Sequence, residues 1–487
     1  MHAKGNLRYR GRDARRSALH RLVLDHLEEF ALRLRAPPDK RPWPRPAAED
    51  HFRRFLECGI VRYGVVRFRC PRCGDDLFVA FSCKLRLCPS CNAKRALIVV
   101  SNAVDRLFPE TPYRQWVLVV PKRLRFFMNR RPDLPGEVSA IFARAIELFL
   151  KRRSQEGASA QLHFIQRTGS ALNLHVHIHA VVAEGVFNLK PGAWGRRRLA
   201  FHRTVPPSEA DILNLTESVR RKVIRRFRKL GALPPEVANE MLAWEHSGFS
   251  IHAKVLIGAK DREGLQRLLH YCARPSLSPK RISYWPKRNM VVYRGEGRKG
   301  KGLSLTFEPV DFLRRWALLA PPPRKNLVRY YGALGPKSPL RPALVAEASR
   351  GTAAARLRLK RDEFGQAASE RVRSWASCIA RLLEVDPLVC RRCSTPMVPI
   401  AVIVDDVEIA RLLKHLGLPA DWPKTSPARS VPPAARDGPD DFDGPPRLRR
   451  DCRRDDPSGR FGPPDNGSQL NPQADLFDGI DPRPADD

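Results

Sequence analysis

The chain has 487 residues, and its 43% hydrophobic content is enough for two or three domains with ordinary cores. Lys and Arg number 88 against 51 Asp and Glu, and the net charge of +37 favours a polyanionic partner, nucleic acid before an anionic membrane. The chain has no run of 18 apolar residues and no apolar signal core, so we expect no membrane contact and a cytoplasmic, nucleoid-associated protein whose 11 cysteines stay reduced.

The first 45 residues are Arg-rich and end in a cluster of prolines, which predicts a basic N-terminal arm rather than a folded domain. Residues 46–105 then hold six cysteines. In a reducing compartment such a density is typical of metal ligands, so we expect a small zinc-binding domain here.

Four of these cysteines form two Cys-x-x-Cys pairs with 14 residues between the pairs: Cys70 with Cys73, and Cys88 with Cys91. Each pair can aim two thiolates at a tetrahedral ion, so we expect one structural Zn²⁺ bound by all four. Cys83 is an alternative ligand, and Cys58 adds one more thiol. The basic side chains around the cysteines predict DNA contacts, the alternative being a zinc staple that does not touch DNA; they are Lys84, Arg86, Lys94 and Arg95.

Strand and helix patterns alternate over residues 106–320, the expected catalytic domain. The expected strands cover residues 115–121, 162–168 and 249–259, and the expected helices cover residues 138–153 and 208–230. A further helix should begin after the capping residue Asp261 and end before Pro275.

The stretch NLHVHIHAVV, residues 173–182, alternates histidine with apolar residues, which predicts a strand with His175, His177 and His179 on one face. Imidazoles about 7 Å apart along a strand can converge on one metal ion or one phosphate. With only 13 histidines in the chain, three within five positions indicate a functional site rather than a chance feature of an exposed strand.

A metal held by histidines could polarise a phosphodiester, but a nucleophile is then needed. Tyr271 is a candidate because Arg267 and Arg274 fall beside it on a helix, where they favour the phenolate and can hold a DNA phosphate. Spacing alone does not choose among the eight tyrosines, and a tyrosine on an amphipathic helix is more often a residue at the edge of the core.

Residues 321–420 form an expected accessory region with a helix over 407–419. The pair Cys390 and Cys393 leaves a second zinc site and two unliganded thiols equally open, because neither Cys378 nor His415 is a compelling further ligand. Residues 421–487 hold 13 prolines and a net charge of −4, which predicts a disordered tail and leaves +41 on the first 420 residues.

Several motifs spread over residues 50–420 resemble those of the zinc-binding, HUH-type rolling-circle transposases of bacterial insertion sequences, the insertion sequence ninety-one family and its common-region relatives. They are FLECG, RCPRCGDDLFVAFSCKLRLCPSC, RQWVLVVP, GSALNLHVHIHAVVAEGVF, GFSIHAKV, LLHYCARPSLSP, LVRYYGALGPKSPLR and KHLGLP. The resemblance implies an α+β fold: an antiparallel, palm-like HUH nuclease sheet with packed helices, preceded by the zinc-binding domain and followed by the tail.

The resemblance also implies roles for particular residues. His177 and His179 match the His-hydrophobic-His metal motif, and Tyr271 matches the nucleophile position. His175 precedes the motif and is then less favoured as a ligand. Two-tyrosine relatives carry a second tyrosine where this chain has Pro275, so the chain resembles the single-tyrosine branch.

A third metal ligand is expected because two imidazoles leave an ion open. In a hairpin centred on residues 171–172, Gln166 would lie opposite His177, which makes it our tentative ligand ahead of Glu184, His252 and His270. The alternative is an amide on the strand surface. Nitrogen and oxygen donors of this kind suit Mg²⁺ or Mn²⁺.

We therefore expect a transposase that nicks and joins single-stranded DNA at the ends of a mobile element and at its target, through a 5′-phosphotyrosine. No phosphate-binding loop GxxxxGK[ST] is present, so unwinding would come from host replication or helicase proteins. The alternatives are a plasmid or phage replication initiator with the same chemistry, and a zinc-dependent DNA-binding protein without activity.

Overall fold

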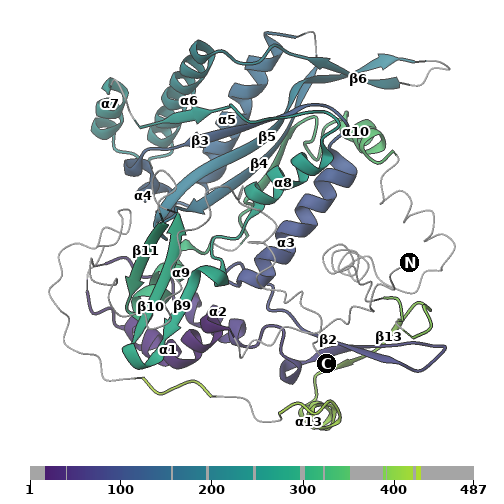
Figure 1. Ribbon diagram of the computed structural model, residues 1–487. Coiled ribbons are helices and arrows are strands. Elements are labelled where there is room, and N and C mark those ends of the chain that lie inside the picture. Colours follow the sequence, from purple (N-terminus) through teal and green to yellow (C-terminus); the bar gives the residue numbers. More distant parts are fainter. Residues whose placement is uncertain are drawn as a thin grey trace.

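The computed structural model describes residues 17–428, except residues 40, 155–156, 193–196, 245–247, 297–301, 322–323, 351–387, 391 and 420–423 (Figure 1). The tail expected over 421–487 lies outside the described residues, apart from 424–428. Within the described residues, no helix combines the length and the apolar character that crossing a membrane requires.

A seven-stranded sheet forms the centre of the fold, and all its pairings are antiparallel. The strand order is β12-β4-β5-β3-β7, with β6 paired to β5 and β8 paired to β3. The strands are β3 (Tyr113–Val119), β4 (Ala158–Thr168), β5 (Leu174–Pro191), β6 (Arg197–Arg203), β7 (Ser250–His252), β8 (Leu256–Ile257) and β12 (Val328–Gly332). This arrangement confirms the predicted α+β class with an antiparallel sheet.

The hairpin of β4 and β5 has the predicted register. Gln166 pairs with His177, and the turn closes where the Gly169 amide donates a 3.0 Å hydrogen bond to the Asn173 carbonyl. Leu172 adopts a left-handed backbone (φ 52°) in this turn. Because side chains alternate between faces along a strand, this register decides which residues of β4 and β5 share a face.

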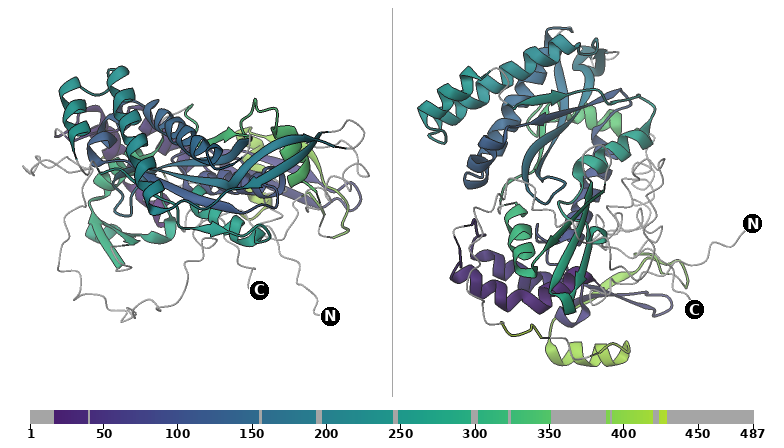
Figure 2. Two further views of the ribbon diagram at one scale, coloured as in Figure 1. Left: turned by 90° about the horizontal axis from the view of Figure 1, so that it is seen from above. Right: turned by 60° about the vertical axis from the view of Figure 1, so that its left-hand side comes forward.

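Helices cover both faces of the sheet (Figures 1 and 2). One face packs against α4 (Lys122–Arg130), α5 (Leu134–Lys151), α6 (Glu209–Lys229) and α7 (Pro235–Ala243). The opposite face packs against α3 (Pro89–Asn102), a π-helical turn (Ala103–Leu107), α8 (Arg262–Ala273) and α10 (Arg341–Ala348). As predicted, α8 begins at the cap Asp261, whose carboxylate accepts a 2.7 Å hydrogen bond from the Gly264 amide.

A second, smaller sheet packs with two helices from the start of the described chain and with one helix that directly follows the sheet in the sequence. It has the order β11-β10-β9, and the elements are α1 (Ala18–Arg35), α2 (Ala47–Leu56), β9 (Ile282–Trp285), β10 (Met290–Glu296), β11 (Gly302–Phe307) and α9 (Pro309–Leu319). The expectation of an N-terminal arm is wrong for α1: Phe30 is buried and packs edge-on against Phe52, whose ring lies 5.0 Å from Trp316. The apolar residues of α1 therefore recur at helical spacing because they form one buried face, and the arginines between them make this spacing hard to recognise in the sequence.

A three-stranded ribbon joins segments that are far apart in the sequence. Its order is β13-β1-β2, with β1 (Val65–Arg69), β2 (Asp76–Ala80) and β13 (Val398–Ile403), followed by α13 (Asp406–His415). The expected boundary between residues 320 and 321 does not separate the central sheet from the region that follows it. β12 lies beyond residue 320, yet it pairs with β4 in the central sheet.

Candidate active site and metal centres

The three histidines of β5 lie on the sheet face that α8 covers. Their rings follow one another with centroids 4.9 Å apart for His175 and His177 and 5.0 Å apart for His177 and His179. His177 and His179 are buried, whereas His175 is half-buried. Burial lowers the pKa of His177 to about 4 and that of His179 to about 3, so both rings are neutral near pH 7 and can offer a lone pair to a metal.

The ring nitrogens of the two buried histidines have different partners. His177 Nδ1 lies 2.7 Å from the His175 carbonyl, to which it donates, and this leaves the lone pair on Nε2. His179 Nδ1 lies 2.9 Å from Gln115 Nε2, while His179 Nε2 is buried and has no hydrogen-bond partner among the described residues. A buried imidazole nitrogen without a hydrogen-bond partner is suited to coordinating a metal ion.

Tyr271 lies directly against His179. Its ring meets the His179 ring edge-on with centroids 5.4 Å apart, and its side chain is 38% exposed. The Arg274 guanidinium lies 4.7 Å from the centre of the Tyr271 ring. Arg267 is on the exposed side of α8 and forms an ion pair with Glu263 at 3.6 Å. The structure thus brings Tyr271, His179 and Arg274 together.

Gln166 reaches the same place from β4. Its Nε2 donates a 2.8 Å hydrogen bond to the Cys272 carbonyl and so links α8 to the sheet. Because the amide nitrogen is used in this bond, the amide oxygen is the Gln166 atom that could bind a metal. The other candidates differ from Gln166 in their partners and burial. Glu184 forms a buried 2.6 Å ion pair with Arg114, and His252 is exposed on β7. His270 is buried, one residue before Tyr271 on α8.

Sequence reasoning missed Gln115. It lies on β3, is 7% exposed, and contacts both His179 Nδ1 at 2.9 Å and Cys272 Sγ at 3.6 Å. The available signal was an amide at the start of QWVLVVP, residues 115–121, where every residue after it is apolar.

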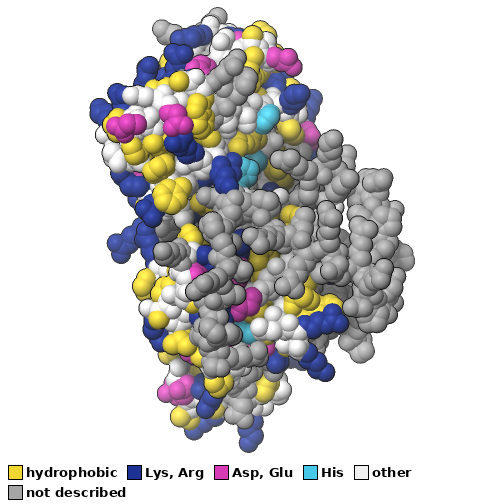
Figure 3. Space-filling view, turned by 90° about the vertical axis from the view of Figure 1, so that its left-hand side faces the viewer, with side chains coloured by type: hydrophobic (Ala, Val, Ile, Leu, Met, Phe, Trp, Pro, Cys, Tyr) yellow, Lys and Arg dark blue, Asp and Glu magenta, His cyan; other side chains and the backbone are white. Residues whose placement is uncertain are grey.

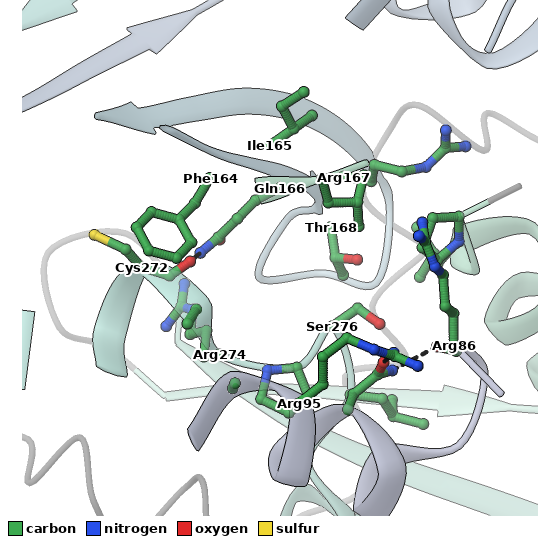
Figure 4. A pocket seen from close by; sticks show the side chains of 18 of the residues that line it. Arg86, Arg95, Phe164, Ile165, Gln166, Arg167, Thr168, Cys272, Arg274 and Ser276 are labelled. Atoms are coloured by element: carbon green, nitrogen blue, oxygen red, sulfur yellow. Dashed lines mark hydrogen bonds between the residues drawn. The ribbon is translucent and has the colours of Figure 1, made fainter. Parts of the chain in front are cut away.

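A basic cavity of about 310 Å³ opens beside Gln166 (Figure 4). Cys272 and Arg274 line it from the end of α8, and Arg86 and Arg95 line it from the cysteine-rich segment. Arg95 is anchored by a 2.7 Å hydrogen bond to Asn92, and Arg86 donates to the Lys325 carbonyl. Burial, followed by the nearby Arg95 charge, lowers the pKa of Arg86. Three of the six basic residues expected to contact DNA, Arg86, Arg95 and Arg274, therefore line one cavity together with Gln166.

Positive charge is spread widely over the surface. Figure 3 shows Lys and Arg side chains along the height of one face, with fewer acidic groups among them. Lys84 has a left-handed backbone (φ 55°), and its carbonyl accepts a 3.0 Å hydrogen bond from Arg95. Lys94 lies on α3, next to Arg95. A surface of this kind suits a polyanion.

The first cysteine cluster consists of Cys58, Cys83, Cys88 and Cys91. The Sγ atom of Cys91 lies 3.6 Å from those of Cys58 and Cys83, and Cys88 Sγ lies 3.8 Å from Cys58 Sγ. Cys58 follows α2, and Cys88 caps α3. The neighbouring thiols lower the pKa of Cys91, as expected where one thiolate is held among thiols.

The second cluster consists of Cys70, Cys73, Cys390 and Cys393. The prediction of one site made by Cys70, Cys73, Cys88 and Cys91 is therefore wrong, since these two pairs lie in different clusters. The physical reason is the β1–β2 hairpin. Cys70 and Cys73 lie in the turn of this hairpin, whereas Cys88 and Cys91 lie at the start of α3. Both Cys83 and Cys58, which the pair spacing left in doubt, belong to the first cluster.

Sulfur atoms 3.3–3.8 Å apart are too distant for disulfides, which need about 2.05 Å. Four thiolates at about 2.3 Å from one ion in a tetrahedron would be separated by about 3.8 Å. Both clusters fit that geometry, with all four ligand atoms of each within 4.8 Å of one another.

Comparisons with known families agree with this geometry. Residues 161–340 match the transposase family Y2_Tnp, and residues 29–120 match the transposase zinc-binding domain Zn_Tnp_IS91. The first match contains His177, His179 and Tyr271, and the second contains the whole first cysteine cluster, which supports structural zinc. No curated protein and no solved structure matches the chain. The chain thus belongs to the IS91 family of DNA transposases with an N-terminal zinc-binding region.

Proposed function

We propose that this transposase nicks and rejoins single-stranded DNA at the ends of its element, with Tyr271 as the nucleophile. The observation that carries the proposal is the contact between Tyr271 and His179, whose ring centroids are 5.4 Å apart. A nucleophile and a metal-binding imidazole at this separation can both reach one phosphate. The 38% exposure of Tyr271 leaves it open to a strand from solvent.

In the proposed step, the Tyr271 oxygen attacks the scissile phosphorus and loses its proton to solvent. A Tyr–O–P bond forms, the bond from phosphorus to the 3′ oxygen breaks, and that oxygen takes up a proton. The products are a 5′-phosphotyrosine and a free 3′-OH. Because one phosphoester replaces another, the step needs no ATP and can be reversed to join strands.

Mg²⁺ or Mn²⁺ would be held by His177 and His179, with the Gln166 oxygen as the third protein ligand, and would supply Lewis-acid polarisation of the scissile phosphate. The unpartnered His179 Nε2 and the neutral state of both rings fit such an ion. Arg274, next to the Tyr271 ring, would hold the phosphate.

The strand would pass through the basic cavity beside Gln166. A volume of about 310 Å³ is at the small end of ligand sites and suits single-stranded nucleotides rather than a duplex. Arg86 and Arg95 would contact phosphates there, which gives the zinc-binding domain a direct part in DNA binding.

The test is a search for the covalent adduct. Oligonucleotides that span the DNA flanking the coding region are incubated with the protein and Mn²⁺, with the label on one end or the other. A 3′ label should move with the protein on a denaturing gel, while a 5′ label should appear on a shorter strand that a polymerase can extend. The opposite labelling result would contradict a 5′-phosphotyrosine.

Tyr271→Phe should abolish the adduct while folding and DNA binding persist. Tyr63→Phe is a matched control. Tyr63 is 41% exposed, similar to Tyr271, but it lies just before strand β1, away from the histidines in the sequence. His177→Ala and His179→Ala should also abolish cleavage, with a trace rescued by excess Mn²⁺. An adduct formed by Tyr271→Phe would place the nucleophile elsewhere, and no adduct with any flanking strand would favour a DNA-binding protein without activity.

A further inference from the structure

The pair Cys390 and Cys393 meets a partner pair from the other end of the chain. Cys393 Sγ lies 3.3 Å from Cys70 Sγ, and Cys390 Sγ lies 3.4 Å from Cys73 Sγ. The partners are separated by 323 and 317 residues in the sequence, so no local spacing reveals them.

The two Cys-x-x-Cys segments share a pair of backbone hydrogen bonds and a left-handed residue after the second cysteine. The Cys70 amide donates to the Asp75 carbonyl and the Gly74 amide to the Cys70 carbonyl, at 2.8 and 3.0 Å. At the corresponding positions, the Cys390 amide donates to the Thr395 carbonyl and the Ser394 amide to the Cys390 carbonyl, both at 2.8 Å. Gly74 and Ser394 are both left-handed, with φ of 75° and 56°.

A non-glycine residue in the left-handed region is uncommon and is retained where the surroundings demand it. Ser394 therefore indicates that the second turn is held in the shape of the first. Two turns of one shape, facing each other with four thiols, match the paired knuckles of a zinc ribbon.

Strand pairing brings the two turns together. β13 pairs with β1 from Val65↔Ile403 to Arg69↔Val398, and this register places Cys70 next to the Cys390 turn. The core beneath the turns is small: its buried members are Phe68, Cys70, Cys390 and Met397. The other end of the ribbon packs against α13 through a second small cluster of Val65, Ile409, Leu412 and Leu413. Both clusters are small, and an ion bound at the turns would add stability where the apolar packing is least.

We propose that Cys70, Cys73, Cys390 and Cys393 bind a second structural Zn²⁺, which fastens β13 and α13 to the N-terminal zinc-binding region. Four thiolates in a tetrahedral arrangement select zinc over the hard ions Mg²⁺ and Mn²⁺. The site is separate from the nuclease chemistry and stands whether or not Tyr271 is the nucleophile.

Zinc stoichiometry of the purified full chain tests the proposal. The unaltered protein should hold two ions per chain, and Cys390→Ser with Cys393→Ser should hold one. Cys70→Ser with Cys73→Ser should also hold one, and all four substitutions together should still leave one, because both pairs serve the same ion. Cys272→Ser is the matched control, since Cys272 is a buried cysteine outside both clusters, and it should keep two.

Two zinc ions in the Cys390/Cys393 variant, or none in the fourfold variant with its central sheet still folded, would overturn the proposal. A measurement on the unaltered chain covers the case in which the variants do not fold. Cys73 is exposed, so only a bound metal would protect it from alkylation. Peptide mapping after alkylation should find Cys73 and Cys393 unmodified while zinc is bound. As a chelator is added, both cysteines should become reactive at the same chelator concentration. Rapid alkylation of Cys73 in the zinc-loaded protein would also refute the site.

Discussion

Gln115 offers the sharpest test of how the candidate metal site is held. Its amide lies 2.9 Å from His179 Nδ1 in a position that is 7% exposed. A half-turn of the amide places its oxygen against Nδ1, where it accepts the ring proton and leaves the lone pair on Nε2 for the metal. We therefore predict that Gln115 positions His179 without touching DNA.

The size of the effect follows from the contact. Gln115→Leu leaves a buried Nδ1 without a partner, at a cost of about 1–3 kcal/mol. Loss of such a supporting hydrogen bond lowers metal affinity about 10- to 100-fold, which corresponds to about 1.4–2.7 kcal/mol. The Mn²⁺ concentration for half-maximal adduct formation should rise by that factor, and the maximal rate should return at saturating Mn²⁺.

Two control variants separate this role from a structural one. Gln115→Glu keeps an oxygen acceptor for Nδ1 and should retain most of the metal affinity. Cys272→Ala removes the other Gln115 contact, at 3.6 Å, and should leave the Mn²⁺ dependence unchanged. An unchanged Mn²⁺ dependence in Gln115→Leu, or a loss of adduct that saturating Mn²⁺ does not restore, would refute the reasoning.

Three further predictions concern other parts of the molecule. Affinity for single-stranded DNA should fall with salt, with a log–log slope of about −4 for roughly six phosphate contacts, and a flat response would contradict electrostatic binding. Glu184→Gln breaks the buried pair with Arg114 and should cost about 3–5 kcal/mol of unfolding free energy without changing Mn²⁺ affinity, whereas a metal ligand would change both. Burial lowers the pKa of His163 to about 3, so protonation opposes folding and stability should decline as pH falls from about 6.5 towards 3; a denaturation series on His163→Gln should show a weaker decline.

Local patterns in the sequence predicted the elements that carry the candidate site. Alternation predicted β5, and the short turn of the hairpin set the register that places Gln166 opposite His177. The Asp261 cap predicted the start of α8, which places Tyr271 within its last turn. These features depend on neighbours within about ten residues, so the chain itself reveals them.

Contacts between distant segments could not be predicted in this way. The spacing of Cys70, Cys73, Cys88 and Cys91 suggested one site because nothing local shows that the β1–β2 hairpin separates the two pairs. Gln115 gained its role only when β3 paired with β5. The arginines of α1 concealed an apolar face that is buried against α2 and α9.

The pairing of β13 with β1 has a consequence for synthesis of the chain. Cys70 leaves the ribosome about 320 residues before Cys393, as the separations of 323 and 317 residues require. At roughly 5–20 residues per second, the interval is roughly 15 to 65 seconds. During that time, the thiols of Cys70 and Cys73 lack Cys390 and Cys393 and can be oxidised or capture metal with the wrong cysteines. A chain cut short before residue 390 would contain every strand of the central sheet but would lack the cysteines that close the ribbon.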